Sequence, residues 1–335
     1  MEGVGMENFY SLMGSTTTNL QDLCLKASKE TGMPVAMVEK DAWVVFILRY
    51  LFHESPWKRH FLFKGGSCLS KCYQAISRFS EDVDILIDWR LLGYDMGGPP
   101  VGESRKKQEG FNNQMVERTR NFIDRMLIPH MGEYFEDVIG KRFTIISTDS
   151  GILFNYPALF GTSSISKAVL LELGPRGIWG IPERKTVSPY IFDYTDKIQD
   201  CCTNVTAISS ERALYEKILI LHTVATREKV PGRYSRHYYD VYSMLDGSAC
   251  MELNHSLLME IVSSKKRFYP GSGYGYDTMA PGSFKLKPPK TVIDVLREDY
   301  QAMGEMIIGS APSFEELIDF MSELERTFND PEAIH

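Results

Sequence analysis

Two aspartates, Asp82 and Asp84, are separated by a single apolar residue. From Asp82 to Asp88, positions that are acidic or apolar alternate with positions that are strictly apolar, which is typical of a β-strand. Because successive side chains of a strand point to opposite faces, the two carboxylates should share one face. Neighbouring carboxylates repel each other unless a positive charge neutralises them. Mg²⁺ is the natural partner, since one or two carboxylates and substrate phosphates bind it. The pair therefore predicts a magnesium site, with Mn²⁺ as an alternative.

A glycine-rich turn lies one predicted helix before these aspartates. Gly65 and Gly66 follow a short strand-like run, Phe61–Lys64, and precede Ser67 at the start of a helix. Glycine lets the backbone approach a ligand closely, and a helix N-terminus offers free N–H groups to a phosphate. The turn and the acidic strand are thus predicted to hold opposite ends of one magnesium–triphosphate unit. Either motif alone is common, and only their order and spacing favour a function.

This order of strand, Gly-Gly-Ser, helix and Asp-Val-Asp matches the polymerase-beta-like nucleotidyltransferases. More closely, the segments Lys64–Ser67 and Arg78–Asp84 resemble the Lys-Gly-Gly-Thr and Arg-Phe-Ser-x-Asp-hydrophobic-Asp signatures of the AbiEii toxin family. Ser67 replaces the commoner threonine and keeps the hydroxyl. Similarity to the C-terminal region of the family continues at Lys265–Tyr269 and elsewhere, so the resemblance spans roughly Phe61 to Asn329.

The resemblance implies a magnesium-dependent enzyme that transfers a nucleoside monophosphate from an NTP to an acceptor hydroxyl. It also implies a toxin of a bacterial toxin–antitoxin or phage-defence pair, with a cognate antitoxin as partner. Some members are similar enough to suggest the 3′ end of tRNA as the acceptor, whose modification would block translation. Two alternatives stay open: a protein or small-molecule acceptor, and a nucleotide-binding module without catalysis. The complete acidic set argues against the second.

Glu172 is the candidate for a third carboxylate, which such sites use as a metal ligand or a base. It lies in an otherwise apolar strand-like run, Ala168–Leu173, where an unpaired charge would be costly. The alternative is a surface glutamate on an edge strand. The turn that follows could bring Arg176 near a phosphate.

Lys217 lies along the edge of the apolar stripe of a predicted helix, Ser209–Thr226. It is four residues from Ala213 and from Leu221, so it shares a helix face with them. A lysine there either extends its amine to solvent or faces a ligand cleft. The resemblance favours the cleft, because the family has a lysine in a matching helix, where it is implicated in binding nucleotide phosphates.

Asp240 ends an arginine-rich segment that resembles one in the family, and the resemblance places this aspartate in the active site. It could fix Lys217 or Arg236 through an ion pair. It could equally be a plain helix ion pair, worth under ~1 kcal/mol at a surface. Arg233 and Arg236 could bind phosphates, whereas the role of His237 is open.

Three polar residues flank the turn and the acidic strand. Lys64 and Arg78 could each contact the triphosphate or pair with a carboxylate of that strand. Ser80 could hydrogen-bond the triphosphate or stabilise the turn. The predicted nucleotide-binding residues are Lys64, Gly65, Gly66, Ser67, Arg78, Ser80 and Arg236. The predicted catalytic residues are Asp82, Asp84, Glu172, Lys217 and Asp240, with Asp82 and Asp84 as metal ligands.

The chain divides by pattern into two parts. Helical patterns cover about Asn19 to Phe52, strand-like runs follow, and the pattern is helical again from Ser209. We predict an α+β fold: a nucleotidyltransferase-type mixed sheet with flanking helices in residues 1–205, and a helical C-terminal domain in residues 206–335. The active site should lie in the cleft between them. For the insertion-like Gly- and Pro-containing stretch Asp88–Lys107 we identify no counterpart in the family.

The composition is that of a globular protein, with 43% hydrophobic residues among 335 and no low-complexity tract. The N-terminus lacks the pattern of a signal peptide, and the most apolar run, Ala42–Phe52, is too short to span a membrane. We therefore predict a cytoplasmic protein with no membrane partner. The six cysteines do not form a disulfide framework and are predicted to be thiols.

The net charge of −7 is unusual for a protein that binds nucleic acid without sequence preference. RNA binding would therefore require a local concentration of basic residues. Tyr269, Tyr274 and Tyr276 lie near some of these and could hold single-stranded RNA by stacking. The basic clusters are Arg105–Lys107; Arg227, Lys229, Arg233 and Arg236; Lys265–Arg267; and Lys285, Lys287 and Lys290.

Overall fold

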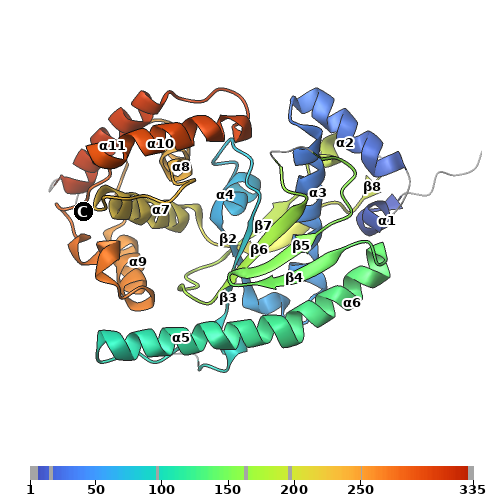
Figure 1. Ribbon diagram of the computed structural model, residues 1–335, viewed down its shortest axis with the longest axis horizontal. Coiled ribbons are helices and arrows are strands. Elements are labelled where there is room, and N and C mark those ends of the chain that lie inside the picture. The colour runs from blue at the N-terminus through green and yellow to red at the C-terminus, as the bar shows by residue number, and fades with distance from the viewer. Residues whose placement is uncertain are drawn as a thin grey trace, which may run out of the picture.

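The computed structural model describes residues 7–14, 18–95, 98–161, 165–194, 198–249 and 251–330. A mixed sheet of seven strands, in the order β4-β5-β6-β3-β2-β9-β7, forms its centre (Figure 1). The predicted mixed α and β class is confirmed. The strands are β2 (Phe61–Lys64), β3 (Val83–Ile87), β4 (Thr144–Thr148), β5 (Gly151–Asn155), β6 (Ala168–Gly174), β7 (Glu183–Val187) and β9 (Thr203–Ala207). A separate parallel pair joins β1 (Glu7–Asn8) to β8 (Ile198–Gln199).

The middle of the sheet aligns residues that lie far apart in the sequence. β3 is parallel to β6, with Asp84 opposite Glu172, and antiparallel to β2, with Lys64 opposite Asp84. Val83 and Ile85, which alternate with Asp84, are fully buried. The alternation of strand side chains therefore turns the charged residues toward one face of the sheet and the apolar ones into the core.

The N-terminal helices surround the sheet. α3 (Val35–Arg49) continues into a π-helical turn, Tyr50–Glu54, and is buried from Ala36 to Leu48 because it packs on the sheet. α5 and α6 run along one edge of the molecule, joined by the π-helical turn Ile123–Leu127 (Figure 1). The other bounds are α1 (Phe9–Gly14), α2 (Thr18–Thr31), α4 (Gly65–Tyr73), α5 (Arg105–Phe122) and α6 (Ile128–Ile139).

Helices alone make up the C-terminal part. α7 begins after Ser209 and α11 begins after Ser313, because each serine side chain accepts a hydrogen bond from a backbone N–H of the first turn. These helices are α7 (Ser210–Ala225), α8 (Ser235–Met244), α9 (His255–Phe268), α10 (Lys290–Met303) and α11 (Phe314–Asn329). Short 3-10 helices cover Lys58–His60, Trp89–Leu92, Phe192–Tyr194, Ser272–Tyr274, Tyr276–Thr278 and Gly304–Met306.

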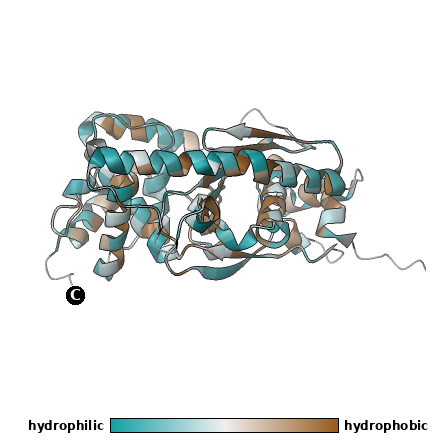
Figure 2. Ribbon diagram, turned by 90° about the horizontal axis from the view of Figure 1, so that it is seen from below, coloured by the Kyte–Doolittle hydropathy of each residue, from teal (hydrophilic) through white to brown (hydrophobic). Residues whose placement is uncertain are grey.

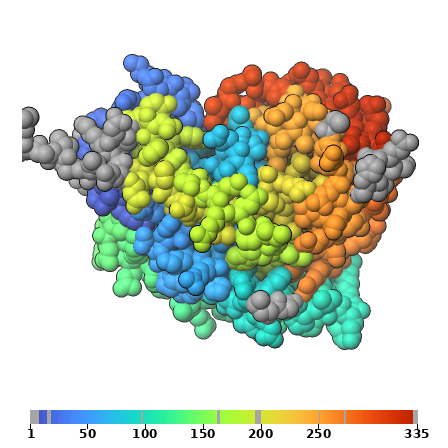
Figure 3. Space-filling model, turned by 180° about the vertical axis from the view of Figure 1, so that it is seen from behind, coloured from blue at the N-terminus to red at the C-terminus, as the bar shows by residue number. Residues whose placement is uncertain are grey.

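One large apolar cluster extends through the sheet and the C-terminal helices, and a small second one contains Ala36, Met37, Phe79 and Ile165. Figure 2 shows hydrophobic and hydrophilic residues interspersed along the same helices, as expected for amphipathic helices around a core. Seen from behind, the middle of the chain lies between the N-terminal and C-terminal parts (Figure 3). The division at residues 205 and 206 stays a prediction, although β9 continues to Ala207.

The structure differs from the sequence prediction at several elements. α5 begins at Arg105, within the stretch Asp88–Lys107, where the side chain of Ser104 accepts a hydrogen bond from Lys107 N. β7 and β9 were not predicted. β7 is an edge strand that is polar from Glu183 to Thr186, so it lacks the apolar alternation of a half-buried strand.

The structure also bears on the predictions about the cysteines and about membrane spans. The five cysteines that the structure describes are free thiols, and Cys250 lies outside the described residues. Across the described part of the chain, no helix combines the length and the apolar character that crossing a membrane requires.

Candidate active site

A central cavity of about 190 Å³ lies where the middle of the sheet meets α4, α7 and α8. Its lining comes from segments up to 200 residues apart, from the glycine turn to the last turn of α9. The predicted site residues Ser67 and Asp240 lie outside this lining. The predicted residues that line the cavity are Lys64, Gly65, Gly66, Arg78, Ser80, Asp82, Asp84, Glu172, Lys217 and Arg236.

Three carboxylates meet on one wall of the central cavity. Glu172 lies beside Asp84 on the neighbouring strand, and Asp82 directly precedes β3. Burial, together with the charges of Asp84 and Asp82, raises the pKa of Glu172 to about 7. Burial and the charge of Asp84 also raise the pKa of Asp82. Because β6 lies between β5 and β3, the edge-strand alternative for Glu172 is wrong.

The glycine turn is shaped by close contacts with the acidic strand. Gly65 has a φ of +79°, and a Cβ at this position would overlap the carboxylate of Asp84. A Cβ on Gly66 would lie 2.8 Å from Ser80 Oγ and 2.9 Å from Arg78 Nη2. α4 begins at Gly65 without a side-chain cap, so its first N–H groups are not satisfied in that way. An anion is the natural partner of such a helix end.

Ser67 occupies a different place from the one predicted. Its buried hydroxyl donates to the carbonyl oxygen of Asp82 and lies 3.2 Å from that of Ser80. The hydroxyl therefore fastens α4 to the loop that carries the aspartates. It is directed at this loop rather than at a ligand in the central cavity.

Asp240 is fully buried between two cations. Arg78 donates to both of its oxygens, from Nε at 2.6 Å and from Nη2 at 2.8 Å, and Lys217 Nζ donates to Oδ2 at 2.6 Å. Burial alone would raise the pKa of Asp240, but the two cations hold it well below its ordinary value. Asp240 thus pairs with Lys217, as one prediction allowed, and with Arg78 in place of Arg236. Arg78 does not pair with the acidic strand.

This group carries a surplus positive charge. One carboxylate faces two cations, so the Arg78–Asp240–Lys217 group has a formal charge of +1 inside the protein. Burial lowers the pKa of Lys217, partly opposed by the charge of Asp240. Only 7% of Lys217 is exposed, which contradicts the alternative that its amine extends to solvent. A buried excess of positive charge favours an anionic ligand.

Three further cations line the cavity, and one of them, Lys265, lies 3.5 Å from Glu216. Within the described part of the chain, Lys64 and Arg236 form no ion pair within 4 Å. Burial would lower the pKa of Lys64, but the charges of Asp84 and Glu216 raise it. Beside them, burial and the charge of Lys217 lower the pKa of His237 well below its ordinary value, so its ring is neutral.

Sequence reasoning missed several residues around the site. Glu216 lines the cavity, 3.5 Å from Lys265, and lies next to Lys217 on α7. Lys40, which is buried in α3, donates to Glu81 at 2.6 Å and so holds the acidic loop from behind. One signal could have revealed Lys40: three consecutive charged residues interrupt the most apolar helix of the chain.

The donor set suits a metal held jointly with a substrate. Among the residues that the structure describes, no three His, Cys, Asp or Glu side chains are grouped to hold a metal without help. Asp82 and Asp84 supply the two carboxylates that Mg²⁺ accepts when phosphates complete its coordination. The fit therefore depends on a phosphorylated substrate in the same cavity.

A comparison with protein families decides the affiliation of this chain. The sequence model for "Nucleotidyl transferase AbiEii toxin, Type IV TA system" matches residues 47–320. The chain belongs to the AbiEii family. It is therefore a nucleotidyltransferase toxin of the type IV toxin–antitoxin class, a class that implies an NTP substrate and a cognate antitoxin.

Other comparisons add little beyond this membership. No curated protein matches the sequence. Among solved structures, the nucleotidyltransferase toxin MenT4 of Mycobacterium tuberculosis is similar over 92% of this chain and 94% of its own, at 15% identity and a TM-score of 0.46.

The arrangement of charges suits the family's chemistry. Nucleotidyl transfer forms a bond between an acceptor oxygen and the α-phosphorus and breaks the bond to pyrophosphate. The central cavity of this AbiEii protein combines carboxylates at β3 and β6 with cations from β2, the loop before β3, α7 and α8. Positioning and charge stabilisation contribute most of the catalysis in such reactions.

Proposed function

We propose that this protein transfers a nucleoside monophosphate from an NTP to the 3′-terminal hydroxyl of tRNA and thereby blocks translation. The single observation that carries the proposal is the composition of the central cavity. Its lining includes Asp82, Asp84 and Glu172 together with Arg78, Lys217 and Arg236. A triphosphate with its divalent cation needs both signs of charge within one cavity.

The cations bind and orient the triphosphate. Lys217 and Arg78 are held rigidly by Asp240, so their positive charge is in place before the nucleotide arrives. Arg236 and Lys64 are free of ion pairs in the described part of the chain, so their charges are available to bind the phosphates. The uncapped start of α4, next to Gly65 and Gly66, offers backbone N–H groups to the same anion.

The carboxylates form the metal side of the site. Asp82 and Asp84 would hold Mg²⁺, or Mn²⁺ in its place, and Glu172 completes the acidic wall as a further ligand or as a base. The bound cation would neutralise charge on the transferring phosphate. Ser67 and Lys40 keep the aspartates in place through the Asp82 carbonyl and Glu81.

The resemblance to some members of the family supports the 3′ end of tRNA as the acceptor. A toxin that alters the 3′ end of tRNA would prevent aminoacylation and stop protein synthesis in the cytoplasm. The same block would limit phage growth in an infected cell. A cognate antitoxin is the partner that would suppress this activity in undisturbed cells.

The first test is an incorporation assay. The purified protein is incubated with Mg²⁺, total tRNA and each α-³²P-labelled NTP in turn. We expect label in tRNA with the unmutated protein and with Asp294→Ala, which removes an exposed aspartate of α10. We expect none with Asp82→Ala. Label in a protein or a small molecule instead would overturn the tRNA assignment, and toxicity that survives Asp82→Ala would overturn catalysis itself.

A further inference from the structure

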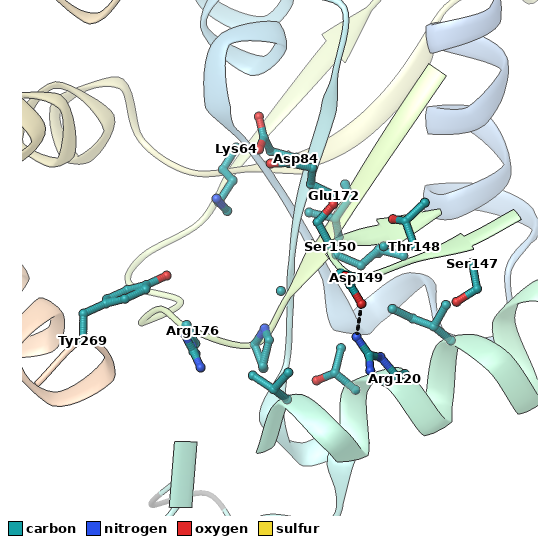
Figure 4. A pocket seen from close by; sticks show the side chains of 18 residues that line it. Lys64, Asp84, Arg120, Ser147, Thr148, Asp149, Ser150, Glu172, Arg176 and Tyr269 are labelled. Atoms are coloured by element: carbon teal, nitrogen blue, oxygen red, sulfur yellow. Dashed lines mark hydrogen bonds and ion pairs between the residues drawn. The ribbon is translucent and has the colours of Figure 1, made fainter. Parts of the chain in front are cut away.

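A second cavity, which we call the lateral cavity, has a volume of about 350 Å³ and adjoins the central one. Lys64, Asp84 and Glu172 line both cavities. Figure 4 shows these three side chains together at one end of the lateral cavity, with Tyr269 and Arg176 farther along. The carboxylates of Asp84 and Glu172 therefore border both cavities. The central cavity accounts for only one of the two substrates, the NTP.

We propose that the lateral cavity binds the last nucleotide of a single-stranded RNA acceptor, with Arg176 and Tyr269 as its binding residues. The inference rests on the proposed function, because it assigns the second substrate of the same reaction. A transfer reaction must bring the acceptor oxygen to the α-phosphate beside Asp84. An acceptor that enters by the lateral cavity reaches this point without displacing the NTP from the central one.

Arg176 and Tyr269 form a paired surface of charge and aromatic ring. The guanidinium carbon of Arg176 lies 5.4 Å from the centroid of the Tyr269 ring, and Lys265 Nζ lies 5.8 Å from it. Arg176 Nε is buried and has no hydrogen-bond partner. An aromatic face takes a base or ribose by stacking, and an adjacent guanidinium takes a phosphate. This donor is therefore available for the backbone of an entering strand.

The aromatic surface continues beyond the cavity. Tyr274 lies 5.7 Å from Tyr269, and it stacks on Tyr276 at 5.5 Å with an interplanar angle of 8°. Arg227 lies over the Tyr274 ring at 5.1 Å. Successive rings beside cations are the usual platform for single-stranded nucleic acid. The cations beside these rings also supply the local positive charge that RNA binding requires in a chain of net charge −7.

The opposite wall offers hydroxyl groups. Ser147, Thr148 and Ser150 of the β4–β5 hairpin line the lateral cavity, and Thr148 Oγ1 is buried without a hydrogen-bond partner. Arg120 of α5 stands beside them and pairs with Asp149 at 2.7 Å (Figure 4). Such a wall can hydrogen-bond a ribose or the edge of a base.

α5 positions part of this surface. Its buried Asn112 donates to the carbonyl oxygens of Arg267 and Phe268 at 2.9 and 3.1 Å. These carbonyls directly precede Tyr269. α5 therefore forms one wall of the lateral cavity and fixes the end of α9 that carries the other. Asn112 is a positioning residue for Tyr269.

Two variants test the assignment in the complete protein. Arg176→Ala and Tyr269→Ala should raise the KM for RNA by roughly 10-fold and leave the KM for NTP unchanged. Tyr269→Phe keeps the ring and should retain the KM of the unmutated protein. Arg326→Ala removes an exposed arginine of α11 and serves as the matched control.

A binding measurement tests RNA binding separately from nucleotidyl transfer. Fluorescence anisotropy with an RNA that ends in a 3′-deoxynucleotide reports acceptor binding without any transfer. Weaker binding by Arg176→Ala and Tyr269→Ala than by Arg326→Ala supports the lateral cavity. Transfer that occurs while both variants bind RNA like the control overturns this inference alone. Tight, Arg176-dependent binding without any nucleotidyl transfer overturns the proposed function and leaves the RNA site standing.

Discussion

Individual residues at this site are coupled in pairs and triads, and their charges act together. Asp240 holds both Arg78 and Lys217 while none of its carboxylate is exposed. Removing a carboxylate from such a group leaves two buried cations that repel each other. Removing one cation leaves an intact pair. The two kinds of substitution should therefore differ in stability and in activity.

Asp240→Ala should destabilise the fold by about 3–5 kcal/mol, because breaking a buried ion pair leaves uncompensated charge. Lys217→Met should leave the free energy of unfolding nearly unchanged, since the Arg78–Asp240 pair persists. Its KM for NTP should nevertheless rise strongly. Urea unfolding and steady-state kinetics measure both effects. Equal stabilities for the two variants would contradict the assignment of surplus charge.

The sequence predicted some of these side-chain contacts and not others. Lys217 and Asp240 were identified through their resemblance to a family pattern, and their ion pair was anticipated. Arg78 as the second partner was not, because 162 residues separate it from Asp240 and no periodicity links them. The hydroxyl of Ser67 was assigned to the nucleotide because a sequence does not show which way a side chain turns.

At the scale of elements, the strand–turn–helix unit from β2 to β3 positions the chemistry. Gly65 adopts a φ of +79°, a region that residues with a Cβ rarely occupy. The absent Cβ also leaves room for the carboxylate of Asp84. This glycine therefore serves both the backbone conformation and the metal site.

Gly65→Ala should abolish nucleotide binding and destabilise the protein by about 1–3 kcal/mol, because it adds backbone strain and a clash. Gly110→Ala provides the comparison. Gly110 lies in α5, and nothing lies within 4 Å of an added Cβ, so this variant should gain up to about 1 kcal/mol. Thermal unfolding and NTP titration distinguish them. A Gly65→Ala variant that binds NTP normally would contradict the packing described here.

Sheet order is the part of the fold that local patterns could not supply. The strands around Asp84 and Glu172 were both predicted, yet their adjacency depends on a crossover that brings β6 beside β3. β7 and β9 were missed for a local reason: β7 is polar from Glu183 to Thr186, and one of the buried positions of β9 is the polar residue Thr203. Helix starts are easier to recognise in a sequence, because capping residues such as Ser209 and Ser313 directly precede α7 and α11.

For the whole molecule, contacts between α7 and the segment between α9 and α10 contribute to the pH dependence of stability. His222 of α7 is buried, and Nε2 lies 2.9 Å from Thr278 Oγ1 while Nδ1 accepts a hydrogen bond from Lys285 N at 3.0 Å. Burial and the charge of Lys285 lower the pKa of His222 to about 4, against a weaker opposing effect of Glu325. The neutral ring is therefore the folded form.

The sign of the pH effect follows. Between pH 6.5 and about 4 the unfolded chain binds a proton at His222 that the folded protein does not bind. Stability should therefore fall as the pH decreases through this window and be unaffected by His222 above it. His222→Gln should reduce the slope of the free energy of unfolding against pH. An unchanged slope would contradict a neutral, doubly hydrogen-bonded ring.

The central claim is that the nucleoside monophosphate of an NTP bound in the central cavity is transferred to the 3′ hydroxyl of tRNA, with pyrophosphate as the leaving group. The most direct measurement compares label transfer from α-³²P-labelled NTP to intact tRNA and to the same tRNA after periodate oxidation of its 3′-terminal ribose. We predict that intact tRNA gains label at its 3′ end and that oxidised tRNA gains none. Equal labelling of both, or label found only in protein or small molecules, would contradict the claim.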